Sequence, residues 1–139
     1  MNHKAWVAKA AKQSMALESV DLGPLGAEDV EVAVEYCGVC HSDLSVLNNE
    51  WGISQYPAIL GHEVVGRITA VGPNAKGLKV GQRVGVGWYS GSCMHCHQCM
   101  SGSHHLCPEV QPTIVGHRGG FATHIRSHWA WAISLPEKL

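Results

Sequence analysis

A two-residue period runs through Val30-Glu31-Val32-Ala33-Val34-Glu35-Tyr36-Cys37. Successive side chains of a β-strand point to opposite faces of the sheet, so this period predicts a strand with one apolar face. That face carries every second residue of the stretch, namely Val30, Val32, Val34 and Tyr36. The same period places Cys37 on the opposite face.

Further short strands are expected along the rest of the chain. Residues 63–71, 81–86, 121–126 and 129–133 have strand character, and glycine- and proline-rich turns such as Gly72-Pro73-Asn74 separate them. Many short strands joined by glycine-rich turns favour a mainly β fold, a small barrel with short helices.

A short helix is expected soon after the first strand. Ser42 and Asp43 offer a helix N-cap, and Leu44 and Leu47 are three positions apart, which places them on one helix face. Asn48-Asn49 would end this helix.

The composition describes one globular domain. The 139 residues are 45% hydrophobic and 15% charged, which is enough apolar material to bury a core. The formal net charge of −1 disfavours nucleic acid or an anionic membrane as a partner. No apolar run approaches the roughly 20 residues of a membrane helix, and lysines interrupt any signal-peptide core near the N-terminus. We therefore expect a cytoplasmic protein whose six cysteines are reduced.

The strongest chemical signal is the motif Cys93-x2-Cys96-x2-Cys99-x7-Cys107. Four thiolates at this spacing can close a tetrahedron around one Zn²⁺ ion, and a site with four protein ligands leaves no open position, so its role is structural. Bacterial iron–sulfur proteins use a related motif that ends in Cys-Pro, and Pro108 follows Cys107, but the last gap here is seven residues instead of three. An iron–sulfur cluster and metal-free thiols are the alternatives. We assign residues 91–111 to a zinc-binding lobe whose histidines, at positions 95, 97, 104 and 105, are expected to be solvated.

Two other segments carry metal-ligand residue types about twenty positions apart. They are Cys40-His41-Ser42-Asp43 and Gly61-His62-Glu63, and a barrel could bring them together. Cysteine and histidine are ligands that zinc prefers, although a lone histidine beside a strand is more often a buried core residue. Cys37 and Cys40 also form a C-x-x-C motif, which occurs in redox proteins. The predicted place of Cys37 on the other strand face disfavours that use.

The surrounding residues are similar to a known family. Gly61-His62-Glu63-x2-Gly66-x5-Gly72-x2-Ala75 resembles the signature of zinc-containing alcohol dehydrogenases of the medium-chain dehydrogenase/reductase superfamily, with Ala75 where the family usually has valine. Residues 37–43 resemble the first metal-ligand segment of that family, and the four-cysteine segment resembles its structural-zinc lobe. Asn49-Glu50-Trp51-Gly52 and Gly87-Trp88 further resemble the cinnamyl-alcohol-dehydrogenase-like and broad aldehyde reductase branch. The resemblance implies a GroES-like β-barrel over residues 1–139.

The resemblance also implies a catalytic zinc site. Cys40 and His62 match the family's catalytic-zinc ligands, and Glu63 matches an acidic neighbour that can approach the metal. Asp43 matches a carboxylate that orients the histidine ligand, which agrees with the general rule that a metal-bound histidine gives its other N–H to an oxygen acceptor.

Four more residues receive roles from the same resemblance. Ser42 matches a hydroxyl that relays the alcohol proton, and His41 matches a basic position that approaches the cofactor phosphates. Trp51 and Trp88 would line the substrate pocket, with ordinary core aromatics as the alternative.

The reaction so implied is the zinc-dependent interconversion of primary alcohols and aldehydes with NAD(P)(H) in a complete enzyme. The third catalytic ligand of the family lies beyond Leu139, and no Gly-x-Gly-x-x-Gly motif of a Rossmann cofactor domain occurs in a strand-to-helix context. The isolated chain is therefore expected to be inactive. A non-enzymatic zinc-binding module and an iron–sulfur electron carrier are the alternative functions.

Overall fold

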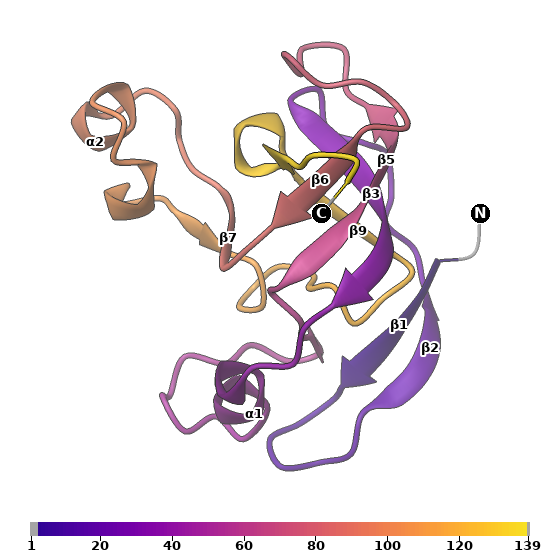
Figure 1. Ribbon diagram of the computed structural model, residues 1–139. Helices are drawn as coiled ribbons and strands as arrows, with labels where there is room; N and C mark the ends of the chain where they lie inside the picture. Colours follow the sequence, from indigo (N-terminus) through magenta and orange to yellow (C-terminus); the bar gives the residue numbers. More distant parts are fainter. Residues whose placement is uncertain (1–2, 139) are drawn as a thin grey trace.

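The computed structural model describes residues 3–138, which form antiparallel sheets wrapped around an apolar core (Figure 1). The mainly β prediction is confirmed. The strands are β1 (His3–Ala8), β2 (Ala16–Val20), β3 (Asp29–Cys37), β4 (Ala58–Ile59), β5 (Val64–Val71), β6 (Arg83–Val86), β7 (Tyr89–Gly91), β8 (Gln111–Pro112), β9 (His124–His128) and β10 (Ile133–Ser134). The helical segments are α1 (His41–Leu47), α2 (His97–Met100) and the 3₁₀ turns η1 (His104–Leu106) and η2 (Trp129–Trp131).

The strands form three sheets. The larger sheet has five strands in the order β10-β6-β5-β3-β9, a second has the order β2-β1-β4, and β7 pairs with β8. An isolated bridge pairs Ala5 of β1 with Ala122, which precedes β9 in the chain.

The main core lies against β3, which pairs with β5 along one edge and with β9 along the other. Val30 and Val32 of β3 are buried with Ile68 of β5 and Ile125 of β9. Full burial of each such side chain contributes about 1.5–3 kcal/mol. This cluster makes β3 the structural centre of the larger sheet.

A second apolar cluster fixes α1. Val46 packs with Leu60 and Ile114, and Leu47 lies partly buried at the edge of the same cluster. Leu44 is exposed, so the predicted helix face of Leu44 and Leu47 is only half correct. The cluster holds α1 against the segment that precedes β5, and this segment contains residues 61–63.

The outer end of β3 differs from the prediction. Its pairing with β5 slips between Val34 and Tyr36. A one-residue slip exchanges the two faces of a strand. Tyr36 is therefore 70% exposed, whereas Cys37 packs against the core cluster beside Val34. The expectation that Cys37 lies opposite the valine face is wrong.

The start of α1 also differs. Its N-cap is Cys40, and Asp43 lies at the third helical position, where its Oδ2 accepts the N–H of Cys40 at 3.0 Å. The predicted N-cap at Ser42-Asp43 is wrong because Asp43 caps the helix from inside its first turn.

The C-terminal region is less regular than predicted. β9 begins at His124, and residues 129–131 form η2 instead of a strand, since the N–H of Ala130 is bound by His128 Nδ1 at 3.1 Å. Only the short β10 continues the sheet, by pairing with β6. The predicted strand over 129–133 is therefore wrong over most of its length.

The N-terminal hairpin was not predicted. β1 and β2 pair from His3–Val20 to Val7–Ala16, and β1 turns Ala5 and Val7 into a small apolar cluster. Lys4 and Trp6, which alternate with Ala5 and Val7, are exposed. One of them is charged and the other aromatic, so the alternation of polar and apolar residues is hard to recognise over the six residues of this strand.

Residues 92–110 project from the barrel as a lobe that contains α2 and η1 (Figure 1). β7 and β8 pair at the base of this lobe. This segment lies within the residues 91–111 for which a zinc-binding lobe is expected, and its zinc stays a prediction. Within residues 3–138, no helix combines the length and apolar character needed to cross a membrane.

Candidate metal centres

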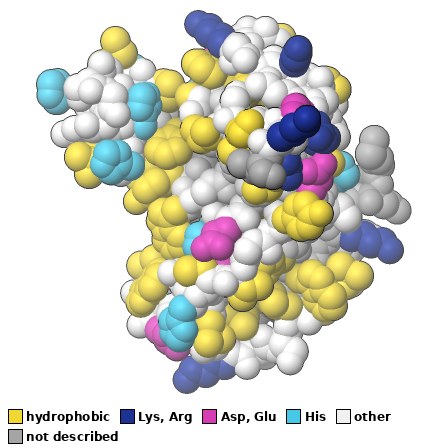
Figure 2. Space-filling model, in the orientation of Figure 1, with side chains coloured by type: hydrophobic (Ala, Val, Ile, Leu, Met, Phe, Trp, Pro, Cys, Tyr) yellow, Lys and Arg dark blue, Asp and Glu magenta, His cyan; other side chains and the backbone are white. Residues whose placement is uncertain are grey.

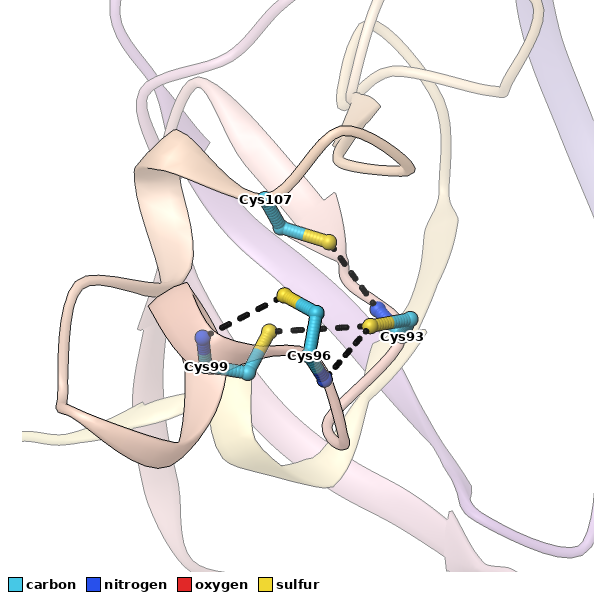
Figure 3. A group of neighbouring side chains, drawn as sticks. All are labelled: Cys93, Cys96, Cys99 and Cys107. Carbon is cyan, nitrogen blue, oxygen red and sulfur yellow. Dashed lines mark hydrogen bonds between the residues drawn. The ribbon is translucent and has the colours of Figure 1, made fainter.

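The four cysteines of the lobe converge (Figure 3). Their Sγ atoms all lie within 4.8 Å of one another, and those of Cys93 and Cys99 are 4.0 Å apart. The residues come from the loop before α2, from α2 itself and from the position after η1. The structure thus brings together all four thiols of the motif.

Backbone N–H groups point at these sulfurs. The N–H of Cys96 donates to Cys93 Sγ at 3.3 Å, and the N–H of Cys99 donates to Cys96 Sγ at 3.4 Å. The N–H of Glu109 donates to Cys107 Sγ at 3.3 Å. Hydrogen bonds of this kind favour the thiolate, which is the form that binds a metal.

The pKa values of two neighbouring thiols diverge. The N–H of His95, helped by that of Cys96, lowers the pKa of Cys93 to about 6. The N–H of Cys99 acts in the same direction on Cys96, but burial and hydrogen bonds with the other thiols outweigh it and raise the pKa of Cys96 to about 11. All four cysteines are free of disulfides. Four convergent thiols with N–H support fit one tetrahedral, thiophilic divalent cation such as zinc.

The lobe histidines lie mainly at its surface, where Figure 2 shows several imidazoles. His95, His97 and His105 are exposed, as expected. His104 is half-buried, and its ring lies edge-on to Trp131 with 6.2 Å between the centroids.

A second donor set lies at the start of α1. Cys40, His62 and Glu63 each place a ligand atom within 4.8 Å of the other two. Cys40 caps α1, whereas His62 and Glu63 directly precede β5. The cluster beneath α1 therefore brings together residues from both predicted segments.

Asp43 links these segments. Its Oδ1 lies 3.0 Å from His62 Nδ1 and accepts the N–H of Gly61 at 2.9 Å, while its Oδ2 holds the N–H of Cys40. The side chains of Asp43 and His62 are only 4% and 8% exposed. Because Nδ1 is engaged, Nε2 is the nitrogen that His62 has free for a metal. One thiolate, one imidazole and one carboxylate form a donor set that fits zinc.

The chain passes His62 in a tight space that requires glycine at position 61. Gly61 has a φ of 93°, and an added Cβ would lie 2.7 Å from the backbone nitrogen of Phe121 and 2.8 Å from Cys37 Sγ. A side chain here would displace the loop and move the Gly61 N–H away from Asp43.

The family described as "Alcohol dehydrogenase GroES-like domain" matches residues 26–137. The chain belongs to this family. The predicted GroES-like fold is confirmed by a cinnamyl alcohol dehydrogenase from Sorghum bicolor, with a TM-score of 0.92 and 34% identity over 100% of this chain and 42% of that one. A second structure, of a cinnamyl alcohol dehydrogenase from Helicobacter pylori complexed with NADP(H), has a TM-score of 0.91 and 28% identity over 99% of this chain and 42% of that one.

Sequence relatives agree with this assignment. This GroES-like domain is 51% identical over 134 residues to aldehyde reductase AdhA of Synechocystis sp., which covers 96% of the chain and 40% of the relative. It is 39% identical over 121 residues to probable cinnamyl alcohol dehydrogenase 6 of Oryza sativa, which covers 82% of the chain and 34% of the relative. The chain thus spans at most 40% of the length of these two relatives.

Two tryptophans of the GroES-like domain lie beside the second donor set. The ring centroid of Trp88 is 4.9 Å from that of His62, and the ring of Trp51 is 6.1 Å from that of Trp88. Trp88 is half-buried and Trp51 is about half exposed. Together they form an aromatic wall next to His62.

Ser42 and His41 occupy the first turn of α1, between Cys40 and Asp43 in the sequence. Ser42 is half-buried and His41 is exposed. A serine hydroxyl can both accept and donate a hydrogen bond, which a proton relay requires.

The GroES-like domain also has a third donor set, which the sequence analysis missed. Cys93, His95 and Glu109 place their ligand atoms within 4.8 Å of one another. The thiol spacing accounts for Cys93 alone, and His95 was expected only to be solvated. The available signal was a carboxylate two residues after Cys107.

Proposed function

We propose that this chain is the catalytic domain of a zinc-dependent alcohol dehydrogenase or aldehyde reductase that interconverts primary alcohols and aldehydes with NAD(P)(H). The observation that carries the proposal is the buried Asp43–His62 pair beside the Cys40 thiol. The names of the relatives, aldehyde reductase and cinnamyl alcohol dehydrogenase, support the substrate class. The NADP(H) complex of the Helicobacter pylori enzyme supports a nicotinamide cofactor.

Cys40 and His62 would hold the catalytic zinc, and Glu63 is a further donor within reach. When bound, zinc supplies Lewis acidity toward an alcohol or carbonyl oxygen, and the nicotinamide supplies hydride chemistry. Glu63 is exposed, so its carboxylate is free to approach or leave the metal position.

Asp43 orients His62 for this role. Its Oδ1 accepts the Nδ1–H of His62, which fixes the tautomer and directs the unprotonated Nε2 toward the metal position. The ring of Trp88 lies edge-on to the imidazole and restricts its rotation. The ligand is thus held before a metal or a substrate arrives.

The neighbouring residues would handle the substrate and the cofactor. Ser42 would take the proton of the alcohol hydroxyl and release its own proton to solvent, because a hydroxyl can accept one proton while it donates another. Trp51 and Trp88 would position the carbon chain and exclude water from it. His41, exposed at the start of α1, would contact the cofactor phosphates.

The four-cysteine centre would hold a structural zinc. Within residues 92–110, Cys99 and Cys107 are the only buried side chains, so this lobe has no apolar core of its own. Binding of a structural zinc can supply about 10–16 kcal/mol, which is enough to order such a segment.

A chimera tests the proposal. Residues 1–139 replace the matching segment of the Synechocystis aldehyde reductase, and aldehyde reduction with NADPH or NADH is measured. The chimera should turn over, and Cys40→Ser should lower its kcat by about 10³-fold, because the lost Lewis acid contributes several kcal/mol. Cys37→Ala, which removes a nearby thiol outside all three donor sets, is the matched control and should retain activity.

The rival functions give different results. A folded, zinc-loaded chimera without turnover would contradict the catalytic proposal and favour a zinc-binding module. A brown protein that contains iron and sulfide would favour an electron carrier.

A further inference from the structure

We propose that Cys93, His95 and Glu109 form an uptake site, which binds zinc first and passes it to the four-cysteine centre. Their ligand atoms lie within 4.8 Å of one another, and Cys93 belongs to both donor sets. The inference rests on the structural zinc site proposed above. It adds a route by which the metal reaches that site.

The backbone of the lobe holds the three residues together. Met94 has a left-handed φ of 66°, and this turn returns the chain so that His95 and Cys96 lie over the Cys93 sulfur. Glu109 is anchored from the other side, because its N–H donates to Cys107 Sγ. The uptake site is therefore built on the same framework as the four-cysteine centre.

Access distinguishes the two sets. Cys99 and Cys107 are only 4% and 3% exposed, so a hydrated ion cannot reach them directly. His95 and Glu109 are exposed, and Cys93 is half-exposed. Cys93 and Glu109 also border a cleft of about 290 Å³ between the lobe and the barrel, lined with polar side chains that include Ser90 and His128. A hydrated ion can therefore meet Cys93 and Glu109 from solvent.

Ligand exchange then has a defined order. An ion held by Cys93, His95 and Glu109 keeps one water and completes four-coordination. The thiols of Cys96, Cys99 and Cys107 replace the imidazole, the carboxylate and the water one at a time, and each thiol releases its proton to solvent. Zinc prefers four thiolates to the mixed set, so transfer runs toward the buried centre. The ion is never stripped of all its ligands at once.

Cobalt(II) tests the inference, because its visible spectrum reports the number of bound thiolates. The reduced, metal-free 139-residue chain is mixed with Co²⁺ in a stopped-flow instrument, in a Cys40→Ser background that disables the other donor set. His95→Gln with Glu109→Gln should slow formation of the four-thiolate spectrum by about tenfold or more, since loss of even an outer partner of a ligand lowers metal affinity 10–100-fold. His105→Gln, an exposed imidazole of the same lobe outside the uptake site, is the control and should leave the rate unchanged.

Equilibrium and reverse rates complete the test. In the His95→Gln, Glu109→Gln variant, the affinity of the four-cysteine centre for Co²⁺ should change less than about twofold. The affinity is the rate constant of uptake divided by that of removal. Removal of Co²⁺ by a chelator must therefore slow by the same factor as uptake. An unchanged uptake rate would overturn the inference. Slower uptake with unchanged removal would also overturn it, since His95 or Glu109 would then belong to the final site. If the Cys40→Ser chain gives no four-thiolate spectrum at all, the structural zinc site of the proposed function is overturned, and this outcome differs from failure of the uptake site alone.

Discussion

The Asp43 carboxylate lies 3.0 Å from Nδ1 of His62, across nineteen positions of sequence, and both side chains are buried. The same carboxylate accepts the N–H groups of Gly61 and Cys40. One side chain thus caps α1, closes the loop before β5 and orients a candidate metal ligand.

Asp43→Asn should weaken metal binding at Cys40 and His62 by about 10–100-fold, because the second partner of a metal-bound histidine contributes that much to affinity. The amide also leaves one buried N–H of Gly61 or Cys40 without its acceptor, which costs about 1–3 kcal/mol of unfolding free energy. Cobalt titration measures the first effect and urea denaturation the second. The four-cysteine spectrum of the same sample is the internal control and should not change. Unaltered affinity at the Cys40 site would contradict the role given to Asp43.

Cys107→Ser should release the zinc of the lobe and make residues 91–111 sensitive to protease, because Cys99 and Cys107 are the only buried side chains within 92–110. Metal analysis and limited proteolysis check this result. Cys37→Ala, whose thiol lies against the barrel core, is the comparison and should leave the lobe protected. A lobe that stays protected in Cys107→Ser would show that it folds without its metal.

His117 gives a pH dependence of stability. Burial lowers the pKa of this imidazole below its ordinary 6.5. The unfolded chain therefore binds a proton more readily than the folded one, and the free energy of unfolding falls as the pH drops below about 6.5. Urea denaturation between pH 7.5 and 5.5 should show a smaller fall for His117→Gln than for the wild type. Parallel pH profiles of the two proteins would contradict this account.

The Glu31–Arg126 pair joins β3 to β9. Arg126 Nη2 lies 2.8 Å from Glu31 Oε2, and the two side chains are 16% and 10% exposed. Burial would raise the pKa of Glu31, but hydrogen bonds from Arg126 and Thr69 outweigh it and lower the pKa. Arg126→Met should therefore cost about 3–5 kcal/mol, since it leaves a buried carboxylate unpaired. Adding Glu31→Gln should restore part of that loss, and a double variant less stable than Arg126→Met would contradict the pairing argument.

The isolated 139-residue chain should fold and hold its structural zinc yet show negligible alcohol dehydrogenase turnover. The sequence has no Rossmann motif in a strand-to-helix context that would hold the nicotinamide next to the zinc. Orientation of bound reactants accounts for roughly 7–11 kcal/mol of a barrier, and loss of about 7 kcal/mol slows a step by about five powers of ten. Assays with a primary alcohol and NAD⁺ or NADP⁺, and with an aldehyde and the reduced cofactors, check this. A kcat near the ordinary value of ~10 s⁻¹ would contradict it.

The sequence predicts elements well where one physical rule dominates. Alternation identifies the extent of β3, and the strand expected at 63–71 is found as β5 at Val64–Val71. The prediction that Tyr36 lies on the apolar face of β3 fails because the slip in pairing depends on the partner strand β5. Alternation within one strand carries no information about its partner. The strand predicted over residues 129–131 fails because His128 Nδ1 accepts the N–H of Ala130, which favours a 3₁₀ turn over strand pairing.

The candidate metal sites also divide into a part that sequence rules predict and a part that they do not. Ligand spacing and family motifs predict Cys93, Cys107, Cys40 and His62 as metal ligands, because their order along the chain is itself the signal, and each of the four belongs to one of the donor sets. Cys93, His95 and Glu109 also lie within 4.8 Å of one another, and the turn between Cys93 and His95 has a left-handed φ at Met94. The residue type methionine does not predict that conformation. Such a local backbone state is visible only in three dimensions.

The lobe leaves and rejoins the barrel at neighbouring points, since Gly91 is paired with Gln111 and Tyr89 with Pro112. The segment between these pairs is therefore an insertion in the topological sense. A short reverse turn grafted from Gly91 to Gln111 would keep the register of every strand in the larger sheet. Evolution or protein engineering can lengthen, shorten or exchange this excursion of the chain while the barrel retains its connectivity.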